Sequence, residues 1–178
     1  MSNRMLILIV VANGLIGTAD AQKGDKSIAA GLLVGLPEND VIYEDNRDWD
    51  YGVGLEGVGQ LNFTDRSAAL LQIQLTRFSG YSYNFLDPNG PTRAPTSALS
   101  LSLKAGYRYQ FTKSGFFANL LAGVETNGLY SSAALGIGKR ITVKEIYFLD
   151  VGIDYSGGFV RRYNIKAVFS IVRRSKID

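Results

Sequence analysis

Between residues 98 and 111 the chain alternates without a break between apolar side chains and small or polar ones. The odd positions carry leucine, alanine and aromatic residues, namely Leu99, Leu101, Leu103, Ala105, Tyr107, Tyr109 and Phe111. The even positions carry mainly serine, lysine, glycine, arginine and glutamine. A period of two is that of a β-strand, and this strand exceeds the usual length of about five or six residues in soluble sheets. The pattern predicts a strand with lipid against one face and a polar interior against the other.

The same alternation recurs along the chain and marks eight strands, at residues 27–36, 51–61, 67–83, 98–111, 115–124, 131–141, 146–155 and 159–172. Tight connections at 62–66, 112–114 and 142–145 alternate with outer connections, of which 37–50 and 85–97 are long and 125–130 and 156–158 are short. An even strand number with tight turns at one end is typical of outer-membrane barrels. We therefore predict an all-β fold, an eight-stranded antiparallel up-and-down transmembrane β-barrel with both termini in the periplasm.

The N-terminus separates this prediction from a soluble ligand-binding barrel, whose strands alternate in the same way. Arg4 precedes an apolar stretch at residues 5–16, and Ala19 and Ala21 provide the small residues of a cleavage site. This arrangement predicts a signal peptide over residues 1–21 and a barrel domain over residues 22–178. The chain has no cysteine, which excludes a lipid anchor and a disulfide framework. No later apolar run of about 18 residues provides a membrane-spanning helix, so the prediction is the bacterial outer membrane.

Outward aromatic residues gather at both ends of the predicted strands. At the periplasmic ends they are Tyr107, Tyr109, Phe111, Phe116, Tyr147 and Phe169, and at the outer ends Tyr51, Tyr81, Tyr83, Tyr155 and Tyr163. The middle of the outward face carries leucine, isoleucine, valine and alanine. Two aromatic belts around an aliphatic band are typical of membrane barrels. A general preference of aromatic residues for strands does not explain their absence from the middle.

Four stretches, LKAGYRYQF, GFFANLLAGV, AALGIGKRI and FLDVGIDYS, resemble the small eight-stranded outer-membrane barrels of the OmpX and OmpA transmembrane-domain type, and the outer-membrane β-barrel domain proteins common in the Bacteroidetes. The resemblance covers nearly all of the chain after the signal and implies the barrel fold, an outer-membrane location and contact with outer-membrane lipid. Its class includes adhesion proteins, small channels, accessory subunits and lipid-modifying enzymes, so the fold alone does not specify a function. Barrels of this family often end on an aromatic residue that the insertion machinery reads. The chain departs from this pattern, because its last outward aromatic residue is Phe169.

Charged residues of both signs fall on the inward face of the predicted strands: Glu56, Lys104, Arg108, Glu125, Arg140, Asp150, Asp154, Arg162 and Lys166. Side chains can fill an eight-stranded barrel, and an unpaired buried charge costs several kcal/mol. We therefore predict a lumen closed by ion pairs, with a narrow polar pore as the alternative. If Gly158 is the apex of a three-residue turn, Asp154 faces Arg162 and Asp150 faces Lys166.

Two outward arginines lie where the outer headgroups are expected. Arg77 shares the outward parity of Ile73 and Leu75, and Arg161 shares that of Tyr163. Arginine binds phosphate through two hydrogen bonds, so we predict that Arg77 and Arg161 contact the phosphates of lipopolysaccharide. The alternative is ordinary snorkelling of a long cationic side chain to the membrane surface.

The remaining composition excludes several function classes. The chain has neither histidine nor cysteine, which removes the usual base for serine acyl transfer and the usual ligands of zinc. Its net charge of +3 forms no basic stripe, so we expect no nucleic-acid partner, and we expect no cofactor and no metal. The acidic connection with Glu38, Asp40, Glu44, Asp45, Asp48 and Asp50 lacks the spacing of an EF-hand, and we interpret it as a solvated loop rather than a Ca²⁺ or Mg²⁺ site.

Together these features predict a non-enzymatic barrel with a structural or interaction role in the cell envelope. That role is contact with lipopolysaccharide or service as an accessory subunit of a larger outer-membrane complex. A narrow passive channel is the alternative, and a lipid-modifying enzyme is a less favoured one.

Overall fold

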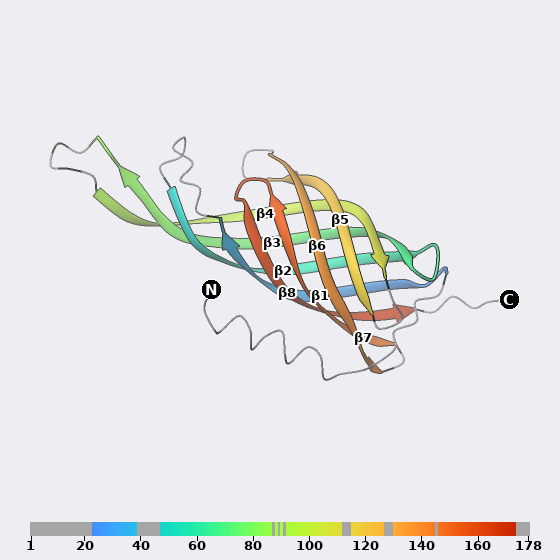
Figure 1. Cartoon of the computed structure of the whole chain (residues 1–178). Helices are drawn as coiled ribbons and strands as arrows, with labels where there is room; N and C mark the ends of the chain where they lie inside the picture. The colour runs from blue at the N-terminus through green and yellow to red at the C-terminus, as the bar shows by residue number, and fades with distance from the viewer. Residues whose placement is uncertain are drawn as a thin grey trace.

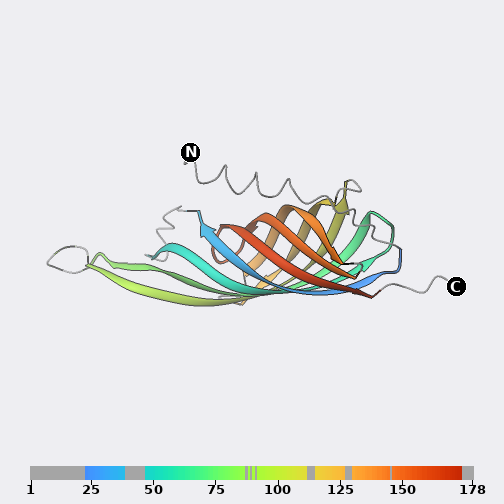
Figure 2. The same cartoon turned by 90° about the horizontal axis from the view of Figure 1, so that it is seen from below.

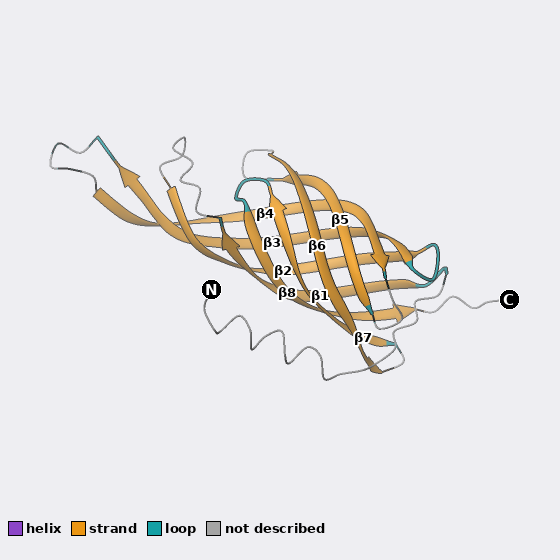
Figure 3. Cartoon of the chain, in the orientation of Figure 1, coloured by secondary structure: helices purple, strands orange, loops and turns teal. Residues whose placement is uncertain are grey.

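The computed structural model describes residues 23–38, 47–86, 88, 90, 92–111, 115–126, 130–144 and 146–173. Eight strands follow one another along the chain (Figure 1): β1 (Lys26–Pro37), β2 (Arg47–Asn62), β3 (Ser67–Asn84), β4 (Thr92–Gln110), β5 (Phe116–Glu125), β6 (Tyr130–Lys144), β7 (Tyr147–Gly157) and β8 (Arg162–Arg173). The described elements are strands joined by turns (Figure 3). Within these ranges no helix is long and apolar enough to cross a membrane. The predicted signal peptide and the part of the acidic connection at residues 39–46 lie outside the described residues.

Each strand pairs antiparallel with the next one, and β8 pairs with β1, so the sheet closes into a barrel. The prediction of an eight-stranded antiparallel up-and-down barrel is confirmed. A row of paired residues followed once around the barrel starts at Lys26 on β1, passes Tyr107 on β4 and Tyr163 on β8, and returns to β1 at Leu36. This stagger of ten residues, from Lys26 to Leu36, tilts the strands by about 40° from the barrel axis.

Strands β2, β3 and β4 are longer than their neighbours and continue past the end of the barrel opposite the β2–β3, β4–β5 and β6–β7 connections. They form a three-stranded ribbon there, made of residues 47–51, 79–84 and 92–98 (Figure 1 and Figure 2). The β1–β2 pairing ends at Gly35 and Gly52, whereas β3 and β4 stay paired as far as Asn84 and Thr92. At about 3.3 Å per residue, the ribbon extends roughly 20 Å past the rim.

The ribbon replaces parts of two predicted connections. The sequence pattern placed loops at 37–50 and 85–97, but β2 begins at Arg47 and β4 begins at Thr92. Residues 92–97 are threonine, arginine, alanine, proline and serine and carry no apolar alternation, yet their backbone pairs with β3. Pro95 is tolerated because proline, which lacks a backbone N–H, is compatible with the edge strand of a sheet.

Side chains alternate between the outer wall and the lumen. On β3 the even-numbered residues from Ala68 to Phe78 are buried, and the odd-numbered ones from 69 to 77 are exposed. The outer wall carries leucine, isoleucine and valine, with Ile28 79% exposed and Ile137 68% exposed, while charged and amide side chains fill the lumen. A soluble barrel would bury its apolar face instead. A continuous apolar wall around a polar interior is the arrangement of a transmembrane β-barrel.

Aromatic side chains meet near both borders of this wall. We call the end with the β2–β3, β4–β5 and β6–β7 connections the turn end, and the opposite end the rim. Ring pairs at the turn end are Phe63–Tyr107, Tyr109–Phe111 and Tyr147–Phe169, and the pair near the rim is Tyr155–Tyr163. The residues predicted for the outer border divide between two places, because Tyr81 and Tyr83 lie on the ribbon, opposite Pro95 and Arg93.

Glycine allows β4 and β5 to approach each other closely. A Cβ atom at Gly106 would lie 2.0 Å from the carbonyl oxygen of Leu120, and one at Gly123 would lie 1.9 Å from that of Leu103. A side chain at either position would push the two strands apart. The same glycines leave room in the lumen for the long side chains of Lys104 and Arg108.

Candidate functional site

All nine charged residues predicted for the lumen have buried side chains, and none is more than 7% exposed. Their positions along the tilted strands group them at three levels. Nearest the turn end lie Arg108, Arg140 and Asp150; in the middle lie Glu56, Lys104, Asp154 and Lys166; near the rim lie Glu125 and Arg162.

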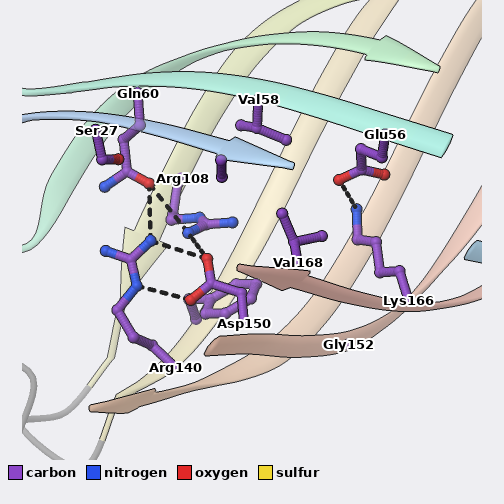
Figure 4. A pocket seen from close by; sticks show the side chains of 12 residues that line it. Ser27, Glu56, Val58, Gln60, Arg108, Arg140, Asp150, Gly152, Lys166 and Val168 are labelled. Atoms are coloured by element: carbon purple, nitrogen blue, oxygen red, sulfur yellow. Dashed lines mark hydrogen bonds and ion pairs between the residues drawn. The ribbon is translucent and has the colours of Figure 1, made fainter. Parts of the chain in front are cut away.

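At the level nearest the turn end, Asp150 on β7 accepts hydrogen bonds from two arginines (Figure 4). Arg140 Nε and Nη2 lie 2.7 and 2.8 Å from its two carboxylate oxygens, and Arg108 Nη1 lies 2.6 Å from Oδ2. Gln60 Oε1 on β2 accepts from both guanidinium groups, at 3.0 and 3.1 Å. Arg108 also donates to Asn119 Oδ1 at 2.9 Å. Since β2 is adjacent to neither β4 nor β6, these bonds cross the bore of the barrel.

In the middle of the lumen, Lys166 lies between two carboxylates. Its Nζ is 2.8 Å from Asp154 Oδ2 and 3.4 Å from Glu56 Oε1. Asn164 Nδ2 donates to the other oxygen of Asp154 at 2.6 Å, and Gln74 Nε2 donates to Glu56 Oε2 at 2.7 Å. Both carboxylates are therefore held by one cation and one amide.

Lys104 crosses the same level from β4 to β7. Its Nζ donates to Ser156 Oγ at 3.0 Å and to Gln74 Oε1 on β3 at 3.1 Å. Both partners are neutral, and the lysine side chain is fully buried. The bond to Ser156 joins two strands that are not neighbours in the barrel.

Near the rim, Glu125 on β5 collects donors from several sides. Arg162 Nη1 on β8 lies 3.1 Å from its Oε1, and the Ser100 hydroxyl donates to the same oxygen. The backbone N–H of Phe159 donates to Oε2 at 3.2 Å. The Arg162 guanidinium also lies 5.0 Å from the centre of the Phe78 ring.

The predicted ion pairs between Asp154 and Arg162 and between Asp150 and Lys166 are wrong. The register of β7 and β8 is shifted by two residues, so the partners are Asp154–Asn164, Asp150–Val168, Gly152–Lys166 and Ser156–Arg162. A shift of two residues keeps each side chain on its own face of the sheet. The four charged groups therefore stay in the lumen and take different partners.

The connection between β7 and β8 explains the shift. It is longer than a three-residue turn, because β8 begins only at Arg162. Val160 is buried, and the ring of Phe159 lies 6.0 Å from that of Trp49. These two apolar residues fold over the mouth of the barrel instead of extending the strand.

The lumen is thus bridged at three levels. Between the cluster nearest the turn end and the middle one lies a cavity of about 10 Å³, bordered by Val58, Gly152 and Val168 (Figure 4). One water molecule needs a cavity of about this size, when the volume includes only the space that the centre of the molecule can occupy. In the part of the chain that the structure describes, no three His, Cys, Asp or Glu residues are grouped to hold a metal ion.

The two outer arginines lie on the exposed wall near the rim. Arg77 lies in a row with Val53 and Ile165, and Arg161 is four residues further up β8 than Ile165. Because the strands are tilted by about 40°, this row descends toward the turn end between Arg77 and Ile165. The four residues from Ile165 to Arg161 rise by about the same height, so both arginines lie at the same level. They are three strands apart, or roughly 20 Å around the wall, and cannot share one small ligand.

The surroundings of the two arginines differ. The backbone oxygen of Arg161 accepts a hydrogen bond from the Glu38 N–H at 2.9 Å. The Glu38 carboxylate in turn accepts a hydrogen bond from the Tyr155 hydroxyl at 2.8 Å. On the turn-end side of Arg77, the next outward row consists of leucines, namely Leu55, Leu75 and Leu101. On the rim side, the next outward row consists of Tyr51, Ser79 and Ser97. Arg77 therefore marks the border at which the wall stops being aliphatic.

Sequence reasoning missed a cation on the ribbon and several lumen acceptors. The Arg93 guanidinium lies 3.5 Å from the centre of the Tyr81 ring and 5.8 Å from that of Tyr83. Arg93 fell in the predicted loop at 85–97, where no parity applied. Gln60, which accepts from Arg108 and Arg140, has inward parity on a predicted strand, and that signal alone would have found it. Ser156, which accepts from Lys104, fell in the predicted connection at 156–158.

No protein-family model matches the sequence, and neither does any curated protein. The structure is similar to that of Ail, the attachment invasion locus protein of Yersinia pestis, with a TM-score of 0.56 and 13% identity over 85% of this chain and 100% of that one. For Ail in complex with the heparin analogue sucrose octasulfate the TM-score is 0.57, again with 13% identity, 85% and 100%. For the outer membrane protein OprG from Pseudomonas aeruginosa it is 0.57, with 13% identity over 88% and 99%. The chain has the fold of the small eight-stranded outer-membrane β-barrels.

Proposed function

We propose that this chain is a non-enzymatic, integral protein of the bacterial outer membrane whose outer wall contacts lipopolysaccharide. The observation that carries the proposal is Arg77, an exposed cation at the rim-side border of an aliphatic wall. The fold and the apolar wall support the membrane location, and the features of residues 1–21 support export. In this arrangement the turn end and both termini face the periplasm, and the ribbon points outward.

The lumen supports a closed, structural interior rather than a channel or an active site. Bonds from Arg108 to Asp150, from Lys104 to Ser156 and from Arg162 to Glu125 each join strands that are not neighbours. The carboxylates engaged by cations here are poor general bases, and the sequence has no histidine to replace them. The exposed surface is therefore the part of this protein with which other molecules interact.

Arg77 suits a phosphate at the membrane surface. The aliphatic wall of such barrels is about 25 Å tall, and Arg77 lies about that far from the turn end along the tilted β3 strand. At this level its guanidinium meets lipid phosphates, which arginine binds through two parallel hydrogen bonds. Further out, Arg93 and Tyr81 present a cation and an aromatic ring on the same face of β3 and β4, where the sugars of lipopolysaccharide would lie.

Arg161 is the weaker of the two contacts. It has the Glu38 carboxylate beside it, which repels an incoming phosphate. The two arginines therefore contact two separate lipopolysaccharide molecules.

The test is the affinity of the folded protein for lipopolysaccharide in bilayer nanodiscs. We expect Arg77→Gln to weaken binding about fivefold, since one cation near a charged membrane surface contributes about 1 kcal/mol. We expect a smaller effect from Arg161→Gln. Lys26→Gln is the matched control, because Lys26 is exposed at the turn end. Equal losses for Arg77→Gln and Lys26→Gln, or no loss for Arg77→Gln, would refute the proposed contact.

The ribbon favours a second role, as an accessory subunit that binds another envelope protein. In the described part of the chain β4 pairs with β5 only from Ser102 onward, so the ribbon presents a strand edge over residues 92–98. Such an edge accepts an added strand from a partner. A photocrosslinker at Thr96 in native membranes should capture one defined partner, and one at Ile73 on the lipid-facing wall should not. Capture of the same partner from both positions would contradict this role.

A further inference from the structure

The lipid-facing wall is hollowed near the turn end. The hollow has a volume of about 370 Å³ and lies over β5, β6, β7 and β8. This volume is in the range of pockets that take a small ligand, about 300–1,000 Å³. Its lining includes Phe111, Phe116, Ile137, Lys139, Val151 and Ile165.

The hollow is a groove that crosses the wall obliquely, from the turn end on β5 toward the rim on β8. Phe116 is paired with Lys139, Lys139 with Val151, and Ile137 lies in one row with Ile153 and Ile165. Because rows climb from β5 to β8, Ile165 on β8 lies roughly 15 Å nearer the rim than Phe116 on β5. One leaflet of a bilayer has about half of a hydrocarbon core of about 30 Å. The groove is therefore as long as one leaflet is deep.

Small residues explain the hollow. Ala118 is the partner of Ile137 on one flank, and Ala167 is the partner of Val151 on the other. Gly138 and Gly152 face each other in the wall behind the groove. These small residues leave the space of the groove, and Ile137, Val151 and Ile165 give it an apolar lining.

A cation lies near the end of the groove that is closest to the turn end of the barrel. Lys139 is half-buried in its lining, and its Nζ lies 5.3 Å from the centre of the Phe116 ring. Phe116 is the first residue of β5 and lies nearer the turn end, so the ammonium group points toward the membrane surface. Apolar walls that end at a single positive charge are complementary to an acyl chain that ends at a phosphate.

We propose that this groove binds one anionic phospholipid of the leaflet at the turn end, with an acyl chain along Ile137, Val151 and Ile165 and the headgroup phosphate at Lys139. The site is distinct from the lipopolysaccharide contacts, which lie at the rim. It gives the wall a fixed lipid on one side of the barrel, whereas the rest of the wall meets exchanging lipid.

Quenching of a single tryptophan by brominated phospholipids tests the site. The native Trp49 is replaced by phenylalanine, and Ile137→Trp places a reporter in the groove. Ile73→Trp on β3 is the control reporter on the opposite side of the wall. Protein in bilayer vesicles is compared in brominated phosphatidylglycerol and brominated phosphatidylcholine.

We expect the groove reporter to show about a fivefold preference for phosphatidylglycerol and the Ile73→Trp reporter to show none, since one lysine near the surface is worth that factor. Lys139→Gln should abolish the preference, Val151→Phe should reduce it by filling the groove, and Lys26→Gln should leave it unchanged. Equal quenching by both lipids at Ile137→Trp would overturn the proposal. A preference that survives Lys139→Gln would also overturn it.

Discussion

Removal of the Asp150 carboxylate should destabilise the barrel strongly. Asp150 accepts hydrogen bonds from Arg140 and Arg108 at 2.6 to 2.8 Å, and all three side chains are buried. Asp150→Ala leaves two guanidinium groups in the lumen, and the acceptors that remain to them among the described residues are the neutral oxygens of Gln60 and Asn119. Loss of one partner of a buried ion pair costs about 3–5 kcal/mol. We expect the free energy of unfolding to fall by about 4 kcal/mol.

The identity of the partner can be read from double mutants. Arg140→Met removes one of the stranded cations, so Asp150→Ala/Arg140→Met should recover about 2 kcal/mol relative to the sum of the single losses. Lys166 interacts with Glu56 and Asp154 instead, so the losses of Asp150→Ala and Lys166→Met should add within about 0.5 kcal/mol.

The assay is reversible urea unfolding of the protein in lipid vesicles, followed by tryptophan fluorescence and by the shift of the folded band on gels. A coupling energy between Asp150 and Lys166 as large as that between Asp150 and Arg140 would refute the register of β7 and β8. A loss below about 1 kcal/mol for Asp150→Ala would refute the claim that this cluster is a buried set of ion pairs.

Three further outcomes are expected. The chain without residues 1–21 should fold in detergent or lipid, migrate on gels in a heat-modifiable way, and aggregate in plain buffer; a folded, detergent-free monomer would contradict the apolar wall. Gly106→Val should destabilise the barrel by about 3 kcal/mol because its side chain meets the Leu120 backbone, whereas Gly57→Val, with nothing within 4 Å of its Cβ, should be nearly neutral; equal losses would refute the close β4–β5 approach. In planar bilayers the wild-type barrel should show no stable single-channel conductance, because the lumen is bridged at three levels; a steady wild-type conductance would favour the alternative of a passive channel.

The alternation of the chain was sufficient to predict the barrel and the charged residues of its lumen. On Ala98–Phe111, parity alone assigned Lys104 and Arg108 to the inside and Leu101 and Leu103 to the wall, as the structure has them. Parity works here because a strand has only two faces and a closed barrel separates lipid from the interior. Partners inside the lumen depend instead on register.

Register and stagger could not be read from the pattern. The pairing of Asp154 with Arg162 failed because Phe159 and Val160 cap the mouth and lengthen the β7–β8 connection by residues that look like a strand start. The common level of Arg77 and Arg161 follows from the ten-residue stagger, to which every strand pair contributes. The ribbon at residues 92–97 is held by backbone pairing with β3, which leaves no trace in side-chain polarity.

The central claim, a barrel that crosses the outer membrane with its ribbon outside, is tested most directly by cysteine labelling, because the chain has no native cysteine. Three single variants suffice: Thr92→Cys on the ribbon, Ile73→Cys on the apolar wall and Arg66→Cys at the turn end. With a membrane-impermeant maleimide, Thr92→Cys should react in intact cells, Arg66→Cys only after the outer membrane is permeabilised, and Ile73→Cys in neither case. Rapid labelling of Ile73→Cys, or labelling of Arg66→Cys but not Thr92→Cys in intact cells, would contradict this account.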